Sequence, residues 1–175
     1  MKRIAIIGSP GAGKSTFARA LSDALDLPLY HLDRLMWKPG WILASREDQI
    51  RLQEEIVRRD SWILDGNYGA TMGIRLEAAD TVIFLDRSRY VCLYHVLKRR
   101  IQYRNKPRPD MTEGNHERLN TEFLRYVWSF PKDKRPALLE SIRQLKSNQR
   151  LYTAKTTKDV KRPLNSLTTH ESPKL

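Results

Sequence analysis

The stretch RIAIIGSPGAGKSTFARALSDAL, residues 3–25, decides the fold of this chain. Its first apolar residues, Ile4 to Ile7, are typical of a buried strand, and the segment after the glycines has the period of a helix. Between them, GSPGAGKS at 8–15 matches G-x-x-x-x-G-K-[ST] in full. This is the phosphate-binding P-loop, in the strand–loop–helix context that it requires. The alternative, a glycine-rich turn that matches by chance, does not explain this context.

The P-loop predicts a site for ATP and Mg²⁺. Its glycines allow backbone N–H groups to converge on phosphate oxygens, and the helix N-terminus adds a partial positive charge. We expect Lys14 to reach the β- and γ-phosphates as a catalytic residue and the Ser15 hydroxyl to ligate Mg²⁺. The predicted nucleotide-binding residues are Gly8, Ser9, Pro10, Gly11, Ala12, Gly13, Lys14, Ser15 and Thr16.

Downstream of the P-loop, strand-like and helix-like segments alternate. The predicted strands after the first are PLYHLD (28–33), WILD (62–65), TVIFLD (81–86) and RLYTAK (150–155). A helix is expected from Ser45, where Asp48 completes a capping box, and another over 70–80. This order predicts a P-loop NTPase fold, a three-layer α/β/α structure with a five-stranded parallel sheet. We expect one domain over residues 1–175, with a loose tail at about 168–175.

The second half is predicted to be mainly helical. A helix from Ser88 would carry an apolar stripe of Tyr90, Leu93, Tyr94, Leu97 and Ile101, with Cys92 in the core. A helix over 119–128 is expected to break near Pro131, because proline lacks the N–H that a helix needs. A further helix is predicted over 136–145, and a short last one within 159–167.

Composition narrows the classes of protein. With one cysteine, the chain cannot form an intramolecular disulfide, and the apolar run near its start is too short for a signal peptide or a membrane span. We therefore expect a cytoplasmic location. The net charge of +12 falls almost wholly on residues 91–175, which implies an anionic ligand or partner.

Other P-loop classes lack their motifs here. A GTPase needs Asn-Lys-x-Asp, and residues 105–108 read NKPR without the aspartate. A ring ATPase would end a strand in Asp-Glu, whereas the candidate strands end in Asp65-Gly66 and Asp86-Arg87. The remaining class is the small phosphotransferases. The P-loop, the strands that end in aspartate and the basic segment that follows them resemble the adenylate kinase-like P-loop kinases.

A closer resemblance covers residues 1–165. The segments HLDRLMWKPGW, WILDGNYGATMGIRLEAADTVIFLD, LKRRIQYRNKPRPDM and FPKDKRPALLE resemble the FlaR or topology modulation proteins, which are related to adenylate kinases. The family name refers to DNA topology, but the motifs indicate phosphoryl transfer.

Two carboxylates are expected at the ends of neighbouring strands. Asp65 lies where related kinases hold Mg²⁺ through water, or it caps the turn before Asn67. Asp33 is expected on the acceptor side of the cleft, as a general base for a hydroxyl acceptor; no base is needed for a phosphate acceptor. The alternative for Asp33 is a helix or turn cap. The histidines, at 31, 95, 116 and 170, show no metal spacing.

Two further residues are candidates for acceptor binding. Trp37, with Trp41 nearby, could stack on a planar acceptor or anchor its loop to the core. Arg75 could reach an acceptor phosphate or lie as a surface arginine on a helix.

The basic run LKRRIQYRNKPR at 97–108 is predicted to be part of a lid at about 97–115. The resemblance to adenylate kinases places arginines here over the transferring phosphoryl group, and Arg99 and Arg100 are the best matches, as catalytic residues. Arg104 and Arg108 are further candidates, while Lys98 and Lys106 are interpreted as a solvated basic face. The alternative is a patch that binds a nucleic-acid backbone.

The function that we predict is that of an ATP- and Mg²⁺-dependent kinase acting on a nucleotide, nucleoside or other small acceptor. The alternative is an ATP-regulated DNA-binding factor that affects DNA topology, with non-specific nucleic-acid binding. The first is favoured because the sequence has an acceptor-side carboxylate and a lid, and no recognisable helix-turn-helix. The acceptor and the oligomeric state do not follow from the sequence.

Overall fold

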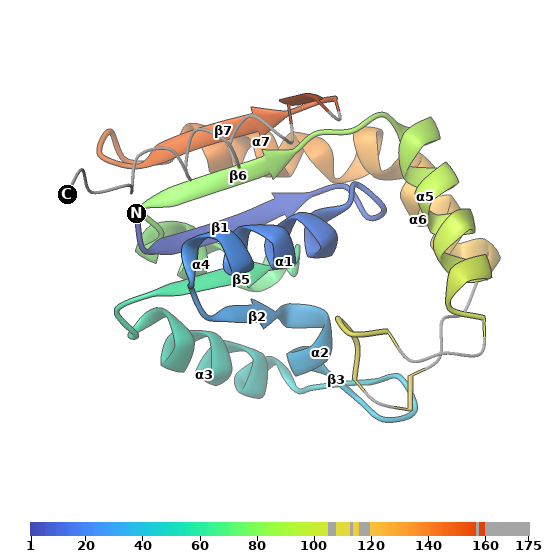
Figure 1. Ribbon diagram of the computed structural model, residues 1–175, viewed down its shortest axis with the longest axis horizontal. Coiled ribbons are helices and arrows are strands. Elements are labelled where there is room, and N and C mark those ends of the chain that lie inside the picture. The colour runs from blue at the N-terminus through green and yellow to red at the C-terminus, as the bar shows by residue number, and fades with distance from the viewer. Residues whose placement is uncertain (105–107, 113, 116–119, 157, 160–175) are drawn as a thin grey trace.

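The computed structural model describes residues 1–104, 108–112, 114–115, 120–156 and 158–159. A five-stranded parallel sheet with the order β2-β5-β1-β6-β7 lies between two layers of helices (Figure 1). Its strands are β1 (Arg3–Gly8), β2 (Leu29–His31), β5 (Trp62–Asp65), β6 (Thr81–Leu85) and β7 (Arg150–Ala154). The predicted fold class is therefore confirmed.

The helices follow the strands in the alternation that the sequence predicts. They are α1 (Lys14–Leu25), α2 (Leu32–Met36), α3 (Arg46–Val57), the 3-10 turn η1 (Gly69–Thr71), α4 (Met72–Ala78), α5 (Arg89–Gln102), α6 (Thr121–Asp133) and α7 (Arg135–Arg143). The N-cap of α3 is as expected, because the Ser45 side chain accepts a hydrogen bond from the Asp48 N–H at 3.1 Å.

The sheet has an apolar core on each face. Along β1, Ala5 and Ile7 pack into one cluster with residues of α3, α4 and α7, and Ile4 and Ile6 pack into the other with residues of α1 and α5. This alternation follows from the two-residue period of a strand. Figure 1 shows the strands all directed toward one end of the molecule, where α5 and α6 lie side by side. The carboxyl ends of the strands therefore meet at one edge, where the P-loop lies.

Three sequence-based expectations need correction. The second strand ends at His31, because α2 begins at Leu32, so Asp33 lies in the first turn of a short helix. Pro131 does not interrupt α6, which continues to Asp133. Its fixed φ suits a helix, and the helix ends only two residues later, so the missing N–H costs one bond near the terminus.

The third correction concerns α5. Four residues of the predicted stripe are exposed, namely Tyr90 (69%), Tyr94, Leu97 and Ile101 (79%). Leu93 alone packs, partly buried, against the core beside the buried Cys92 and Val96. Two apolar stripes run along this helix, and periodicity cannot tell which one faces the sheet. The expectation that Cys92 lies in the core is confirmed.

Besides the short helix α2, a hairpin was missed. A two-stranded antiparallel hairpin, β3 (Trp37–Lys38) with β4 (Ile42–Leu43), follows α2. Within the ranges described, no helix is both long and apolar enough to cross a bilayer. The predicted tail at 168–175 and most of the predicted last helix, 160–167, lie outside the described residues.

Candidate active site

A cavity of about 1430 Å³ opens at the carboxyl edge of the sheet, and the P-loop forms its floor. Two glycines are required by the geometry of this loop. A Cβ on Gly8, at φ +142°, would lie 2.3 Å from the Leu85 carbonyl oxygen, and one on Gly11, at φ +78°, would lie 2.4 Å from that of Cys92. Helix α1 begins at Lys14, so its N-terminus points at the cavity as the motif predicts. The cavity is lined by the loop from Pro10 to Thr16.

Lys14 lies between the loop and two carboxylates. Its Nζ donates hydrogen bonds of 3.1 Å to the carbonyl oxygens of Gly8 and Ser9. Burial lowers the pKa of Lys14, while the charges of Asp65 and Asp33 oppose that change. The three side chains all line the cavity, so the structure brings together the predicted catalytic lysine and both predicted carboxylates.

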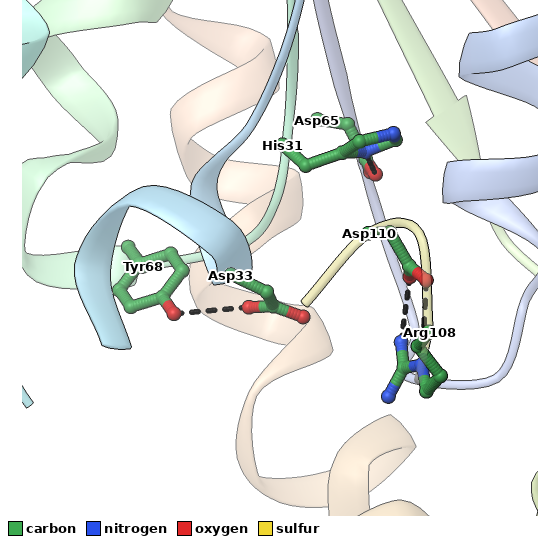
Figure 2. Close-up of polar contacts among 6 residues, drawn as sticks. All are labelled: His31, Asp33, Asp65, Tyr68, Arg108 and Asp110. Atoms are coloured by element: carbon green, nitrogen blue, oxygen red, sulfur yellow. Dashed lines mark hydrogen bonds and ion pairs between the residues drawn. The ribbon is translucent and has the colours of Figure 1, made fainter. Parts of the chain in front are cut away.

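Asp65 has a partner that the sequence analysis missed. His31 Nδ1 lies 2.9 Å from Asp65 Oδ2, and their side chains are 10% and 4% exposed (Figure 2). Among the described residues, the other carboxylate oxygen, Oδ1, is buried without a hydrogen-bond partner. The sequence analysis considered His31 only as a metal ligand and found no suitable spacing to other ligands. It could not predict the pair with Asp65, because this contact depends on the register of two strands.

Asp33 faces the cavity from α2 and is held by Tyr68. The Tyr68 hydroxyl donates a 2.9 Å hydrogen bond to Asp33 Oδ1, and the Trp37 indole hydrogen-bonds the same hydroxyl. Burial raises the pKa of Asp33, and the charge of Asp65 raises it further. In Figure 2 the second oxygen of Asp33 points away from Tyr68, toward the side where Arg108 lies. The capping alternative for Asp33 is not supported, because no side-chain capping bond is present at the start of α2.

Aromatic side chains line the same cavity as Asp33. Trp37 and Trp41 of the hairpin lie edge to face, with ring centroids 5.6 Å apart, and both line the cavity together with Tyr68 and Tyr126. The charge of Asp33 contributes to a raised pKa of Tyr126, after the larger effect of burial, which places this phenol near the carboxylate. Tyr126 could not be selected from the sequence, because it comes from α6, far along the chain.

The predicted lid residues separate in the structure. Arg99 and Lys98 line the cavity, whereas Arg100 is not among the residues that line it. Consecutive residues of a helix point about 100° apart, so the Arg100 side chain can point away from a cavity that Lys98 and Arg99 line. Arg99 also lies 5.9 Å from the Phe123 ring centroid. The interpretation of Lys98 as only a solvated residue is therefore incomplete, and Lys106 lies outside the described residues.

Arg108 and Asp110 bring a third carboxylate to the cavity, after Asp33 and Asp65. Arg108 Nη2 lies 2.6 Å from Asp110 Oδ2, and both side chains are nearly buried (Figure 2). Burial raises the pKa of Asp110, but the charge of Arg108, with hydrogen bonds from Arg108 and Ser15, outweighs it and lowers the pKa to about 2. Asp110 is thus ionised beside Ser15, the predicted Mg²⁺ ligand.

The same segment contacts the hairpin. Thr112 Oγ1 donates to the carbonyl oxygen of Arg34 at 2.7 Å and also contacts that of Trp37. Asn115 accepts from the Trp41 N–H at 2.9 Å and donates to the Lys38 carbonyl oxygen at 2.9 Å. The described part of the predicted lid therefore packs against the aromatic side of the cavity.

Arg75 is buried, so the alternative of a surface arginine is wrong. It is 0% exposed, and its guanidinium donates to Gln53 Oε1 at 2.9 Å, to the Gly66 carbonyl oxygen at 3.0 Å and to the Asn67 carbonyl oxygen. Burial lowers its pKa to about 9. Arg75 is not among the cavity-lining residues. Its predicted acceptor role stays a prediction that this geometry does not favour.

The residues of the cavity fit a magnesium–nucleotide complex better than a protein-held metal. In the part of the chain that the structure describes, no three His, Cys, Asp or Glu side chains could together hold a metal ion. Mg²⁺ commonly keeps several waters and takes few protein ligands when it binds with phosphates. The buried Asp65 Oδ1, which has no partner among the described residues, and the Ser15 hydroxyl suit that role.

The comparison with curated proteins identifies a relative of this chain. A shikimate kinase of Rhodococcus jostii (strain RHA1) is 34% identical over 134 residues, which are 69% of this chain and 76% of that protein. The chain belongs to the family of P-loop kinases that includes this enzyme. Because it belongs to this family, it is a small-molecule kinase. No family model matches it.

Solved structures agree on the fold of this kinase. The shikimate kinase from Acinetobacter baumannii, in complex with shikimate, superposes with a TM-score of 0.60 at 16% identity, over 99% of this chain and 96% of that one. The deoxyadenosine kinase from M. mycoides superposes with a TM-score of 0.50 at 14% identity, over 95% and 97%. These similarities extend the P-loop kinase fold over nearly the whole chain.

Proposed function

We propose that this kinase is ATP- and Mg²⁺-dependent and transfers the γ-phosphoryl group to a hydroxyl of a small acceptor. One observation carries the choice of a hydroxyl. Asp33 is half-buried and lines the cavity together with Lys14, and each charge affects the pKa of the other. A carboxylate at this point would repel an acceptor phosphate, but it can accept the proton of a hydroxyl.

The P-loop and the basic side chains of the cavity would bind and orient the triphosphate. Backbone N–H groups of the loop and Lys14 would face the phosphates, and Arg99 lines the same cavity from α5. Ser15 and, through water, Asp65 would hold Mg²⁺, which supplies charge neutralisation on the phosphate oxygens. Fixed cations in a buried site stabilise the negative charge that shifts during transfer.

Asp33 would act as the general base. As the acceptor oxygen forms its bond to the γ-phosphorus, the bond to the bridging oxygen breaks and ADP leaves, and the hydroxyl proton passes to Asp33. A raised pKa makes this carboxylate a stronger proton acceptor at neutral pH. The hydrogen bond from Tyr68 fixes the carboxylate by one oxygen, which leaves the other for the acceptor.

The aromatic side chains favour an acceptor with a flat face. Trp37, Trp41 and Tyr126 line the same cavity as the base, and aromatic rings offer large stacking surfaces with a few polar groups at their edges. Among the predicted acceptors, a nucleoside or another flat alcohol fits better than a nucleotide phosphate. The resemblance to FlaR proteins, the cytoplasmic location and the DNA-binding alternative remain predictions, and no contact of the described residues favours the last of these.

A screen with labelled ATP tests the proposal. Neutral alcohols such as nucleosides and sugars, the carboxylated alcohol shikimate, and nucleoside monophosphates would each be offered with Mg²⁺. We expect labelled product from a neutral alcohol, dependent on Mg²⁺, and its loss in Asp33→Asn. Transfer only to a nucleoside monophosphate, unaffected by Asp33→Asn, would contradict the assignment of a hydroxyl acceptor.

A further inference from the structure

The last residues of two neighbouring strands form a buried pair. His31 ends β2 and Asp65 ends β5, and the two are Cα partners in the parallel pairing of these strands. Register partners in neighbouring strands direct their side chains to the same face of the sheet. The 2.9 Å contact between Nδ1 and Oδ2 therefore follows from the pairing of the strands and not from a flexible loop.

The two carboxylate oxygens of Asp65 differ in their hydrogen bonding. An ionised carboxylate only accepts hydrogen bonds, so the Nδ1–H of His31 donates to Oδ2. Among the described residues, Oδ1 has no hydrogen-bond partner, although it is buried. A buried carboxylate oxygen without a partner is costly, which indicates that this atom has a partner in the working complex. Asp65 also lines the nucleotide cavity.

Lys14 and Asp65 line the same cavity and carry opposite charges. The charge of Asp65 raises the pKa of Lys14, as it also raises that of Arg75. Lys14 Nζ nevertheless bonds the carbonyl oxygens of Gly8 and Ser9. Without the bond from His31, the Asp65 carboxylate would turn freely toward this lysine. A direct pair would remove both groups from the nucleotide.

We infer that His31 is a positioning residue, which holds Asp65 by Oδ2 and thereby keeps Oδ1 for the hydrated Mg²⁺ of the bound nucleotide. This inference rests on the proposed nucleotide-dependent function. His31 touches neither the metal nor the phosphates in this assignment; it acts through Asp65 alone. Groups that orient metal-binding carboxylates in this way commonly change metal affinity by about 10- to 100-fold when they are removed.

Two other roles for His31 fit the structure less well. A direct metal ligand would need further ligands, and no group of three candidate ligands is present in the ranges that the structure describes. A purely structural bond between strand ends would add little, because β2 and β5 already pair through their backbones at Leu29 with Ile63 and at Tyr30 with Leu64.

The test compares His31→Ala with His31→Asn. The amide nitrogen of asparagine is attached to Cγ, as Nδ1 of histidine is, so Asn can donate to Oδ2 from nearly the same place. ATP affinity would be measured by calorimetry with Mg²⁺ and with EDTA, and binding of Mn²⁺ to the ATP complex by electron paramagnetic resonance. Mg²⁺ should increase the ATP affinity of the wild-type protein, and we expect this increase to be about tenfold smaller in His31→Ala. The ATP affinity measured in EDTA should be the same in both proteins. His31→Asn should retain most of the wild-type affinity.

The double variant His31→Ala/Asp65→Asn separates the inference from a general loss of folding. It should bind Mg²⁺ and ATP no more weakly than Asp65→Asn, because His31 acts only through Asp65. Equal losses with Mg²⁺ and in EDTA, or no loss in His31→Ala, would overturn the positioning role while the proposed kinase function stands. If the wild-type protein binds no ATP, the proposed function fails and the inference fails with it.

Discussion

The Tyr68 hydroxyl lies 2.9 Å from Asp33 Oδ1, although the two residues are 35 positions apart in the chain. This hydrogen bond lowers the pKa of Asp33, against the larger upward effect of burial. Tyr68 adopts a positive φ of 22°, which is uncommon for a residue with a side chain. The backbone carbonyls of the two residues before Tyr68, Gly66 and Asn67, accept hydrogen bonds from Arg75. The position of the proposed base thus depends on a constrained turn.

Tyr68→Phe should shift the pH dependence of turnover. Because the hydroxyl stabilises the ionised carboxylate, its loss raises the pKa of Asp33 further above the ordinary range. The base must be ionised to accept a proton, so activity is lost as the pH falls through this pKa. The acid limb of the kcat profile should therefore move to higher pH in Tyr68→Phe. Identical acid limbs in the two proteins would show that Asp33 does not control this limb.

Lys14→Ala should leave the protein folded but weaken ATP binding and lower phosphoryl transfer on the order of a hundredfold or more, because the site loses a fixed charge facing the phosphates. Thermal unfolding, calorimetric ATP binding and labelled-phosphate transfer check the three parts. We expect the variant to fold because the Lys14 side chain bonds only to carbonyl oxygens of its own loop, those of Gly8 and Ser9, among the hydrogen bonds described. Near-normal turnover in the folded variant would show that this loop is not the catalytic phosphate-binding loop.

Asp65→Asn and Asp33→Asn should fail in different ways. Asp65 is assigned to the Mg²⁺ shell, so its variant should need a higher Mg²⁺ concentration for half-maximal activity. Asp33 is assigned to the acceptor, so its variant should lose about 10²–10⁴ in kcat while ATP affinity stays near normal. Magnesium titrations of activity and equilibrium ATP binding distinguish the two. Equal losses of ATP affinity in both variants would refute this division.

Arg99→Ala should impair turnover far more than Arg100→Ala does. Arg99 lines the cavity and Arg100 does not, although the two are adjacent and carry the same charge. We expect Arg99→Ala to lower kcat by about a hundredfold or more with a smaller effect on ATP affinity, because the charge acts mainly in the transition state.

Arg100→Ala controls for the overall loss of positive charge. If both variants keep full transfer but lose DNA binding at matched salt, the basic segment is a polymer-binding patch and not part of the kinase site.

Arg75→Ala should destabilise the fold by about 3 kcal/mol or more, because three oxygen acceptors lose their donor and a buried volume is emptied. Urea unfolding at neutral pH measures this. The matched control is Arg58→Ala, an arginine that is 77% exposed and should change stability by less than about 0.5 kcal/mol. A normally stable Arg75→Ala variant with weakened acceptor binding would instead support the acceptor role predicted from the sequence.

The nucleotide half of the site could be predicted from the sequence. The P-loop is a contiguous motif whose glycines, lysine and helix start are local in the chain, so GSPGAGKS gave both the residues and their arrangement. The strands were also predictable, since WILD and TVIFL are short apolar runs that only a buried parallel sheet accommodates. Asp33 and Asp65 were found because aspartates near the carboxyl ends of parallel strands meet at one edge of the sheet.

The partners of these site residues, and the choice among the other candidates, were decided only by the tertiary structure. Strand register joins His31 to Asp65, the turn at 66–68 brings Tyr68 to Asp33, and the packing of α6 brings Tyr126 to the same cavity. The same packing buries Arg75 and selects Arg99 over Arg100. Some of these contacts join residues that are far apart in the chain and belong to no motif or periodic pattern. The others depend on how a helix is rotated about its axis. A sequence specifies local conformation directly, but such contacts exist only once distant segments have packed together.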